Sequence, residues 1–473
     1  MTLDNDIPGS RLECQTGSSK KYDAFLKEFN LSISGIDEYI TTCNRFYDVD
    51  EYVSKNPHVA SHNPLSIVDD INKWKGLRQP ELPDKFRDVD NNVQKEFYNN
   101  DGTTVWCTTP SSTATSVVAV QYPDAPPSAS SWNWASPSLL SPTYAAFGDP
   151  NTGWQLGEKA QTQNAGYVGT IKNQGSCAGC WAFATAAALE SAYKINNPQK
   201  EFVNLSPQHL LQCPWNKTPN KDSLALLGCN GGTAIDGHNF LRNRGWSASI
   251  YKNDPAFGWP VDGGIALQQT NTSEQLNMGK LDEWTSFDEA PNNILPSNPP
   301  NGLNNFCTNS ESQNSVQFDN VCYWGRTASS GTDETFNKLK NIIYKQPITI
   351  GIATGLSSTP WFNNYGPEPY NFGTPPPSTP SDWEPIPVPK DSEKDIGRVD
   401  HSVLAVGYGS DSQKCQAQYG SPNYYIIKNS WDYWWGYGGY GKICANSLGP
   451  NGMDEPSIAC STKGLGSKQA ADN

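Results

Sequence analysis

Long apolar runs are absent from this sequence of 473 residues. A helix that crosses a membrane needs about 20 consecutive apolar residues, so no membrane span is expected. Charged residues are also scarce, at 17%, and acidic side chains outnumber basic ones by 48 to 34, which gives a formal net charge of −14. Because the basic residues are scattered, a surface for nucleic acids or anionic membranes is not predicted.

The start of the chain, MTLDNDIPGSRLECQTG, lacks the apolar stretch of a secretion signal. Twelve cysteines are nevertheless many for a chain in a reducing compartment, and most lie in loop-like contexts. The abundance of Gly, Pro, Asn, Ser and Trp is also typical of loop-rich secreted or lysosomal enzymes. We therefore expect several disulfides and an oxidising compartment of the lysosomal, vacuolar or secreted type, although no leader is visible that would indicate the route.

The sequence contains one C-x-x-C motif and no second C-x-x-C that could complete a metal site with it. It is formed by Cys177 and Cys180 in QGSCAGCWAFA. A structural zinc site needs about four Cys or His ligands in paired spacings, and a thioredoxin-like redox pair needs a βαβ unit, whereas the residues upstream are irregular. Neither a metal nor another cofactor is therefore expected. The remaining interpretation gives the two cysteines separate functions.

Two regions of different composition divide the chain. Residues 20–98 are the most charged, and within them KKYDAFLKEFN and IDEYITTCNRFYDVDEYV carry apolar residues at helical spacing. Residues 108–131 are almost free of charge and rich in Thr, Ser, Ala and Pro, as is typical of an extended connector. We place a boundary near residue 124. The predicted parts are an N-terminal region 1–123, helical over 20–98 with a connector over 99–123, and a domain over 124–473.

The second domain mixes helix, strand and loop signals. CWAFATAAALESAYKIN predicts a long helix that starts at Cys180 and stops at the following Asn-Asn-Pro. Runs rich in β-branched and aromatic residues predict strands at 347–353, 402–409 and 424–431. Stretches without periodicity predict loop insertions at about 135–165, 247–306 and 355–399.

Cys180, at the start of a helix, is suited to act as a nucleophile, because the helix dipole and unpaired amide groups stabilise a thiolate. A thiolate needs a base, and the chain has five histidines. His58 and His62 lie in the charged N-terminal region. His209 and His238 lie in helix-like contexts that favour a solvated or core-packed imidazole. His401 begins the apolar run HSVLAVGYG, where a strand can hold the ring rigidly, and is the best candidate base.

Four motifs together closely resemble the papain-like cysteine peptidases, the family of papain and the cathepsins. They occur in the order of that family: NQGSCAGCWAFA (173–184), CNGG (229–232), VDHSVLAVGYG (399–409) and IIKNSWDYWWGYGGYGKI (426–443). The resemblance implies an α+β fold, with a helical left domain and an antiparallel β-barrel-like right domain. It also implies a cysteine endopeptidase that hydrolyses peptide bonds of protein or peptide substrates through an acyl-enzyme intermediate.

The resemblance also implies roles for individual residues. Cys180 is expected to be the nucleophile and His401 its base, paired as thiolate and imidazolium. Asn429 is expected to orient the imidazole, and Gln174 to donate to the oxyanion. The residues expected to bind substrate or to cover the site are Gly231, Gly232 and Trp431.

Other residues of the motifs are expected to be structural. Trp435 matches a core tryptophan of the family, and Asp400 is expected to have a local loop role. Trp434 is an additional aromatic residue without an assigned role. The family pattern implies a disulfide between Cys177 and Cys229.

The remaining cysteines keep several pairings open. Cys213 is expected to join Cys307 or Cys322. The sequence does not pair Cys415, Cys444 and Cys460. Cys14, Cys43 and Cys107 lie in the N-terminal region, so an unpaired thiol and a bridge across the domain boundary are both open.

Residues 20–98 resemble an inhibitory propeptide of the same family. Val59-x-x-x-Asn63 resembles a helical signature, and Asn72-Lys-Trp74 resembles an anchoring element. APPSASSWNW (125–134) resembles a mature N-terminus, which places cleavage near 120–128. The resemblance thus implies a monomeric proenzyme that its own propeptide inhibits.

Departures from the family pattern leave two alternatives to an active endopeptidase. Cys180 and His401 lie 221 positions apart, more than is usual in the family. The Pro-rich stretch 374–390 either narrows the cleft where the leaving part of the substrate binds, which favours exopeptidase action, or is a surface loop far from it. A catalytically silent protein with a binding or structural role is the other alternative.

Overall fold

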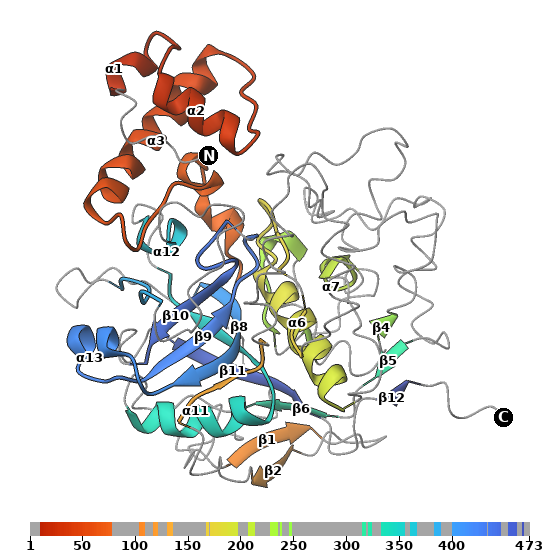
Figure 1. Cartoon of the computed structure of the whole chain (residues 1–473). Helices are drawn as coiled ribbons and strands as arrows, with labels where there is room; N and C mark the ends of the chain where they lie inside the picture. Colours follow the sequence, from red (N-terminus) through yellow and green to blue (C-terminus); the bar gives the residue numbers. More distant parts are fainter. Residues whose placement is uncertain are drawn as a thin grey trace, which may run out of the picture.

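The computed structural model describes an N-terminal helical unit that lies on a larger α+β body (Figure 1). The α+β prediction is confirmed by this arrangement. The described residues are 10–77, 104–108, 117–121, 130–135, 167–169, 171–196, 207–212, 228–234, 237–238, 246–247, 315–317, 320–323, 333–354, 360–366, 383–388, 400–432, 434–445, 453–460 and 466–467.

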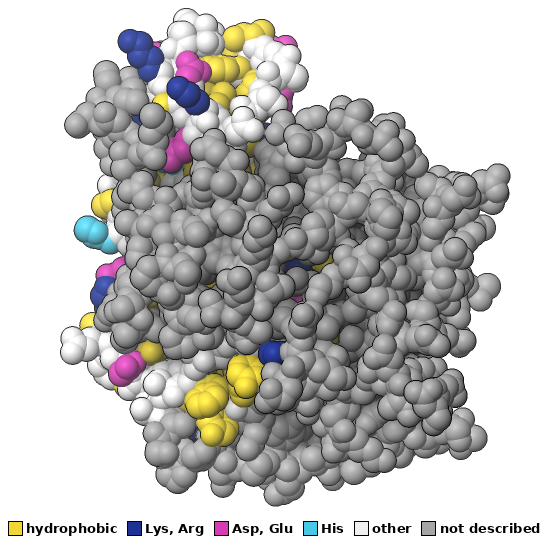
Figure 2. All heavy atoms as spheres, turned by 45° about the vertical axis from the view of Figure 1, so that its right-hand side comes forward, with side chains coloured by type: hydrophobic (Ala, Val, Ile, Leu, Met, Phe, Trp, Pro, Cys, Tyr) yellow, Lys and Arg dark blue, Asp and Glu magenta, His cyan; other side chains and the backbone are white. Residues whose placement is uncertain are grey.

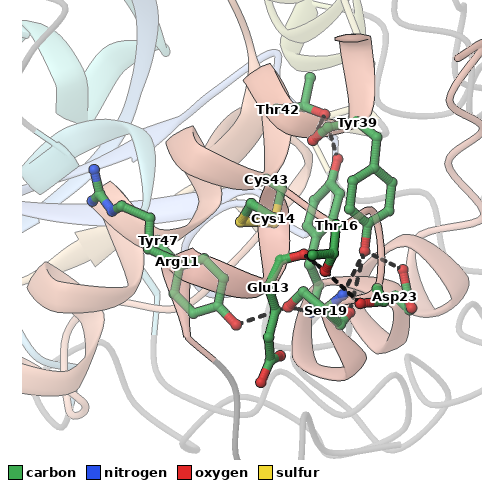
Figure 3. Close-up of a disulfide and its surroundings, with 12 residues drawn as sticks. Arg11, Glu13, Cys14, Thr16, Ser19, Asp23, Tyr39, Thr42, Cys43 and Tyr47 are labelled. Atoms are coloured by element: carbon green, nitrogen blue, oxygen red, sulfur yellow. Dashed lines mark hydrogen bonds between the residues drawn. A yellow bond between two sulfur atoms is a disulfide. The ribbon is translucent and has the colours of Figure 1, made fainter. Parts of the chain in front are cut away.

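The N-terminal unit contains α1 (Arg11–Cys14), α2 (Lys20–Glu28) and α3 (Ile36–Lys55), and the last two confirm the helical spacing of the sequence. Their apolar faces form a small core of their own, closed by a disulfide between Cys14 and Cys43 (Figure 3). A unit of this size buries little apolar surface, so a disulfide contributes a large share of its stability.

Helix does not continue through the rest of the region predicted as helical. Pro57 lacks an N–H group, and α3 ends two residues before it. The expectation of a helical signature from Val59 to Asn63 is wrong, because Ala60 forms an antiparallel bridge with Tyr365 instead. Two 3₁₀ turns follow, η1 (Pro64–Ile67) and η2 (Ile71–Trp74). Residues 78–98 of the predicted helical region lie outside the described residues.

One nine-stranded antiparallel sheet dominates the body (Figure 1). Its strands run in the order β10-β9-β8-β7-β11-β6-β1-β2, and β3 pairs with β8. The three runs predicted as strands form β7, β8 and β9. The bounds are β1 Thr104–Thr108, β2 Val117–Gln121, β3 Trp132–Asn133, β6 Asn320–Tyr323, β7 Ile348–Ile352, β8 His401–Gly409, β9 Tyr424–Lys428, β10 Tyr440–Cys444 and β11 Met453–Cys460. A second sheet has the order β12-β5-β4, with β4 Trp246–Ser247, β5 Ser315–Gln317 and β12 Gly466–Ser467.

The predicted connector contributes the hairpin of β1 and β2 to the large sheet. β1 pairs with β6, and the register sets Cys107 opposite Cys322. The described parts of the connector, residues 104–108 and 117–121, are thus strands paired within the sheet of the body. The boundary near residue 124 stays a prediction.

Helix α6 (Cys180–Asn196) packs against β8 and starts and stops where the sequence predicts. It has apolar residues on every side, and such a helix is stable only when it is buried. Accordingly, Trp181, Ala186 and Leu189 are fully buried. The remaining helical elements of the described body are α7 Pro207–Gln212, η8 Gly228–Asn230, α11 Asp333–Lys345, α12 Pro360–Asn363 and α13 Gln413–Tyr419.

Part of the predicted insertion 355–399 belongs to the core. Trp383 is 1% exposed and stacks on Tyr437, with ring centroids 4.9 Å apart. The Lys442 ammonium donates to the Trp383 carbonyl, 2.9 Å away. Residues 383–388 are therefore no surface loop, because their apolar side chains fill space beside β10. The neighbouring parts of the insertion, 367–382 and 389–399, lie outside the described residues.

Within the part of the chain that the structure describes, no helix is long and apolar enough to cross a membrane. Figure 2 shows basic, acidic and hydrophobic side chains next to one another on the N-terminal unit. Leu12 and Ile36 are the large hydrophobic side chains exposed there.

Candidate active site

The predicted nucleophile and base are the first residues of α6 and β8, two elements that pack against each other. Cys180 is the first residue of α6, and His401 is the first residue of β8. Both side chains are fully buried, and Cys180 is the free cysteine among the described residues. The backbone N–H of Ser402 donates to the Cys180 sulfur at 3.3 Å.

The predicted orienting residue contacts the imidazole directly. Nε2–H of His401 donates to Oδ1 of Asn429 at 2.8 Å. The same oxygen accepts from the backbone N–H of Ser430 at 2.8 Å, which holds the amide in place. A proton on Nε2 leaves Nδ1 of His401 as the nitrogen that can accept one, and Nδ1 is buried without a hydrogen-bond partner. The ring centroids of Trp431 and His401 lie 4.6 Å apart, so the indole shields the imidazole from water.

Gln174 is oriented from both ends of its side-chain amide. Oε1 accepts from the Ser430 hydroxyl at 2.6 Å. Nε2 donates to the carbonyl of Cys177 at 2.8 Å and to that of Trp74 at 2.9 Å. The Gln174 amide therefore already donates to one carbonyl of the body and to one of the N-terminal region.

The predicted disulfide between Cys177 and Cys229 is confirmed and holds the loop before α6. The backbone N–H of Ala178 donates to the Cys229 carbonyl at 3.0 Å. Gly232 has a packing reason as well as the expected substrate role, because a Cβ there would lie 2.6 Å from the Trp181 ring. Gly231 has a φ of 108°, a conformation that favours glycine.

The segment Trp74–Leu77 of the N-terminal region covers this site. The backbone N–H groups of Gly76 and Leu77 donate to the Asp400 carbonyl at 3.1 and 3.0 Å. The Gly76 carbonyl accepts from Gly232 N–H at 2.9 Å, and Leu77 forms a parallel bridge with Gly232. A Cβ on residue 76 would lie 1.9 Å from the Ala178 carbonyl oxygen, so only glycine fits there.

The indole residues of the site also contact this segment. The Trp431 Nε1–H donates to the Trp74 carbonyl at 2.9 Å, alongside Gln174. The Trp74 ring packs edge-on against Trp431 and against Trp434, at centroid distances of 6.5 and 6.0 Å. Trp434, for which the sequence indicated no role, is thus part of the surface under the segment. No sequence signal outside Asn72-Lys-Trp74 pointed to this contact.

Burial shifts the pKa values of the central pair toward their neutral forms. The pKa of the Cys180 thiol is raised to about 12, because burial outweighs the stabilising N–H groups of Ser402, Trp181 and Leu77. The pKa of His401 is lowered to about 3, mainly by burial and to a lesser degree by the charge of Lys75. In the covered form burial therefore favours the uncharged thiol and the uncharged imidazole. The thiolate–imidazolium pair expected for the active enzyme stays a prediction.

Two other histidines whose side chains the structure describes are buried away from solvent elsewhere in the fold. His62 hydrogen-bonds Asp50 within the N-terminal unit at 2.9 Å. His238 is fully buried, and burial lowers its pKa to about 3, which confirms a core position. His209 lies on α7, as the helix-like context predicts, with its side chain outside the described residues.

Two further disulfides answer questions that the sequence left open. Cys14 joins Cys43 within the N-terminal unit, and Cys415 on α13 joins Cys444 on β10. The predicted partners Cys213 and Cys307 lie outside the described residues. For Cys107, Cys322 and Cys460 only the backbone is described, so the expected bond from Cys213 to Cys307 or Cys322 stays a prediction and Cys107 and Cys460 remain without an assigned partner.

A family model described as papain family cysteine protease matches residues 157–365 and 387–459, more than half of the chain. Among curated proteins, KDEL-tailed cysteine endopeptidase CEP2 of Arabidopsis thaliana is 26% identical over 65% of this chain and 57% of that protein. Cysteine proteinase COT44 of Brassica napus is 29% identical over 61% of this chain and 59% of that protein. The chain thus spans less than two thirds of the length of these relatives.

Among solved structures, the digestive procathepsin L2 proteinase from Tenebrio molitor larval midgut has a TM-score of 0.50 and 18% identity, over 93% of this chain and 98% of that one. The similarity to this structure is one of fold, and the matched length includes the N-terminal region of this chain. Residues 366–386 fall outside the family match and form the unmatched part of the predicted insertion 355–399.

Proposed function

This chain belongs to the papain family of cysteine proteases, and on that premise we propose that it is a cysteine endopeptidase made as a precursor that its N-terminal region inhibits. The observation that carries the proposal is the convergence of Cys180, His401 and Asn429 under the segment Trp74–Leu77. The Cys180 sulfur accepts from the backbone N–H of Ser402, 222 positions further along the chain, at 3.3 Å. The hydrogen bond of 2.8 Å between His401 and Asn429 lies beside this contact.

Catalysis begins when the covering segment leaves and water reaches the pair. The burial that opposes charge is then relieved, so Nδ1 of His401 takes the proton of the Cys180 thiol. The thiolate attacks the carbonyl carbon of the substrate, and a tetrahedral intermediate with an oxyanion forms. The Gln174 amide and the backbone N–H of Cys180 donate to that oxyanion, and each such donor contributes about 3 kcal/mol.

The imidazolium of His401 then protonates the leaving amine, and the C–N bond breaks to give a thioester on Cys180. Water, deprotonated by His401, hydrolyses the thioester and restores the thiol. Asn429 keeps the ring oriented through both steps, as the third member of a triad does. Trp431 excludes water from their hydrogen bond.

Inhibition follows from the same contacts. The Trp74 carbonyl accepts a hydrogen bond from the Gln174 amide. The Gly76 carbonyl accepts from the Gly232 N–H, and the N–H groups of Gly76 and Leu77 donate to the Asp400 carbonyl. A substrate cannot use these groups while the segment remains. We also propose an oxidising compartment, since three disulfides are formed among the described residues. The expected monomer is tested by gel filtration.

Covalent labelling by an epoxysuccinyl inhibitor of cysteine proteases tests the proposal. Full-length chain should label slowly, and chain whose N-terminal region has been cleaved should label rapidly and degrade an unstructured protein. Cys180→Ala should abolish both labelling and proteolysis. Labelling without proteolysis would favour a catalytically silent binding protein, and trimming only from peptide ends would favour an exopeptidase.

A further inference from the structure

Lys75 and Asp400 form an ion pair inside the covered site. The distance between Nζ of Lys75 and Oδ2 of Asp400 is 3.0 Å, and the Lys75 side chain is only 3% exposed. Lysine is almost never buried this far unless it is paired. The carboxylate of the body therefore accommodates a basic side chain brought to it by a peptide chain that lies in the cleft.

The body holds this carboxylate in place without the covering segment. Oδ1 of Asp400 accepts from the backbone N–H of Thr354 at 2.9 Å and from its hydroxyl at 3.0 Å. The Asp400 backbone N–H donates to the Ile352 carbonyl at the end of β7, at 3.1 Å. When Lys75 departs, the carboxylate stays oriented and loses its cationic partner. The local loop role expected for Asp400 is thus accompanied by a second contact that only the fold creates.

This carboxylate lies close to the reacting atoms. Asp400 precedes His401, and its carbonyl accepts from the N–H groups of Gly76 and Leu77, the two residues after Lys75. The Leu77 N–H also contacts the Cys180 sulfur. A chain that touches Cys180 therefore has a side chain within reach of Asp400 only one or two residues away.

We propose that Asp400 is a binding site for a basic side chain of the substrate, so that the mature enzyme prefers Lys or Arg at one position within about two residues of the scissile bond. This inference rests on the proposed function and adds a substrate class to it. A carboxylate with prepared geometry binds ammonium and guanidinium groups through charge-assisted hydrogen bonds. It repels a carboxylate at the same position.

The test uses peptides that differ only by Lys, Met or Glu at each position around one cleaved bond. Activated enzyme should cleave the Lys peptide about tenfold more efficiently than the Met peptide at one position, as kcat/KM, and the Glu peptide least. Asp400→Asn should reduce that ratio below about twofold. Asp411→Asn, which changes an exposed aspartate after β8, should leave the ratio as it is.

The proposal is overturned when no position prefers Lys, or when the preference survives in Asp400→Asn. An equal loss of activity on all three peptides in Asp400→Asn would make Asp400 a positioning residue for His401 and would also overturn it. Failure of the proposed function gives a different result: no peptide is cleaved, and Cys180 does not react with the epoxysuccinyl inhibitor.

Discussion

At the scale of single residues, Asn429 determines which nitrogen of His401 carries the proton. Asn429→Ala removes the acceptor of the 2.8 Å hydrogen bond, and the ring loses its orientation. We expect kcat of the activated enzyme to fall by about 100-fold or more, with a smaller change in KM. Steady-state kinetics on one peptide check this, with thermal unfolding as the control for folding. Unchanged kcat would show that the packing of Trp431 alone orients the ring.

The pKa values of the same pair predict how pH controls release of the segment. Covered His401 takes a proton only near pH 3, whereas exposed histidine takes one near pH 6.5. In Cys180→Ala, where no thiol can supply this proton, the released form therefore binds more protons between these values and is favoured as pH falls through that window. For Cys180 the thiol pKa is raised from 9 to about 12, so release is also favoured as pH rises above about 9.

Tryptophan fluorescence of the full chain measures this release, because Trp74 packs on Trp431 and Trp434. Cys180→Ala prevents self-cleavage and removes the alkaline effect. In that variant the fluorescence change should begin below about pH 6.5. An identical acid transition after the additional change His401→Gln would contradict this prediction and assign the effect to other groups.

At the scale of elements, the Cys14–Cys43 disulfide joins the end of α1 to α3 (Figure 3). The double change to serine releases a loop of 29 residues and should lower the free energy of unfolding of the N-terminal unit by about 2–4 kcal/mol. Because this unit carries the covering segment, activation should become faster. The Cys415–Cys444 bridge has the same separation of 29 residues but lies in the body, and its removal should not speed activation. Equal rates for both double variants would contradict the prediction.

At the scale of the whole molecule, the N-terminal unit docks on the body through asparagines. Asn364 Nδ2 donates to the Ser61 carbonyl at 3.2 Å and to the Ser66 hydroxyl at 2.8 Å. Asn364→Ala removes the side-chain donor from the Ser61 carbonyl and from the Ser66 hydroxyl, at a cost of about 1–3 kcal/mol. We expect activation to be about tenfold faster or more, as followed by release of a fluorogenic peptide product. Asn56→Ala, which loses only a contact within α3, should have little effect.

Local sequence patterns determined much of this protein. The spacing of apolar residues predicted α2, α3 and α6, and the β-branched runs predicted β7, β8 and β9, because these periodicities are intrinsic to helix and strand. The motifs also predicted the disulfide between Cys177 and Cys229 and named the residues that meet at the site. These signals lie within short stretches of chain.

Only the tertiary structure decided which distant surfaces meet. It buried Trp383 beside β10, although its Pro-rich surroundings predicted a loop, and it joined residue 60 to residue 365 where helix was expected. It also set Lys75 against Asp400 and Trp74 against Trp434. Such contacts depend on the packing of faces that no local period encodes. The neutral state of Cys180 and His401 likewise follows from burial by a segment about 100 residues away from Cys180 in sequence, and burial is a property of the folded chain.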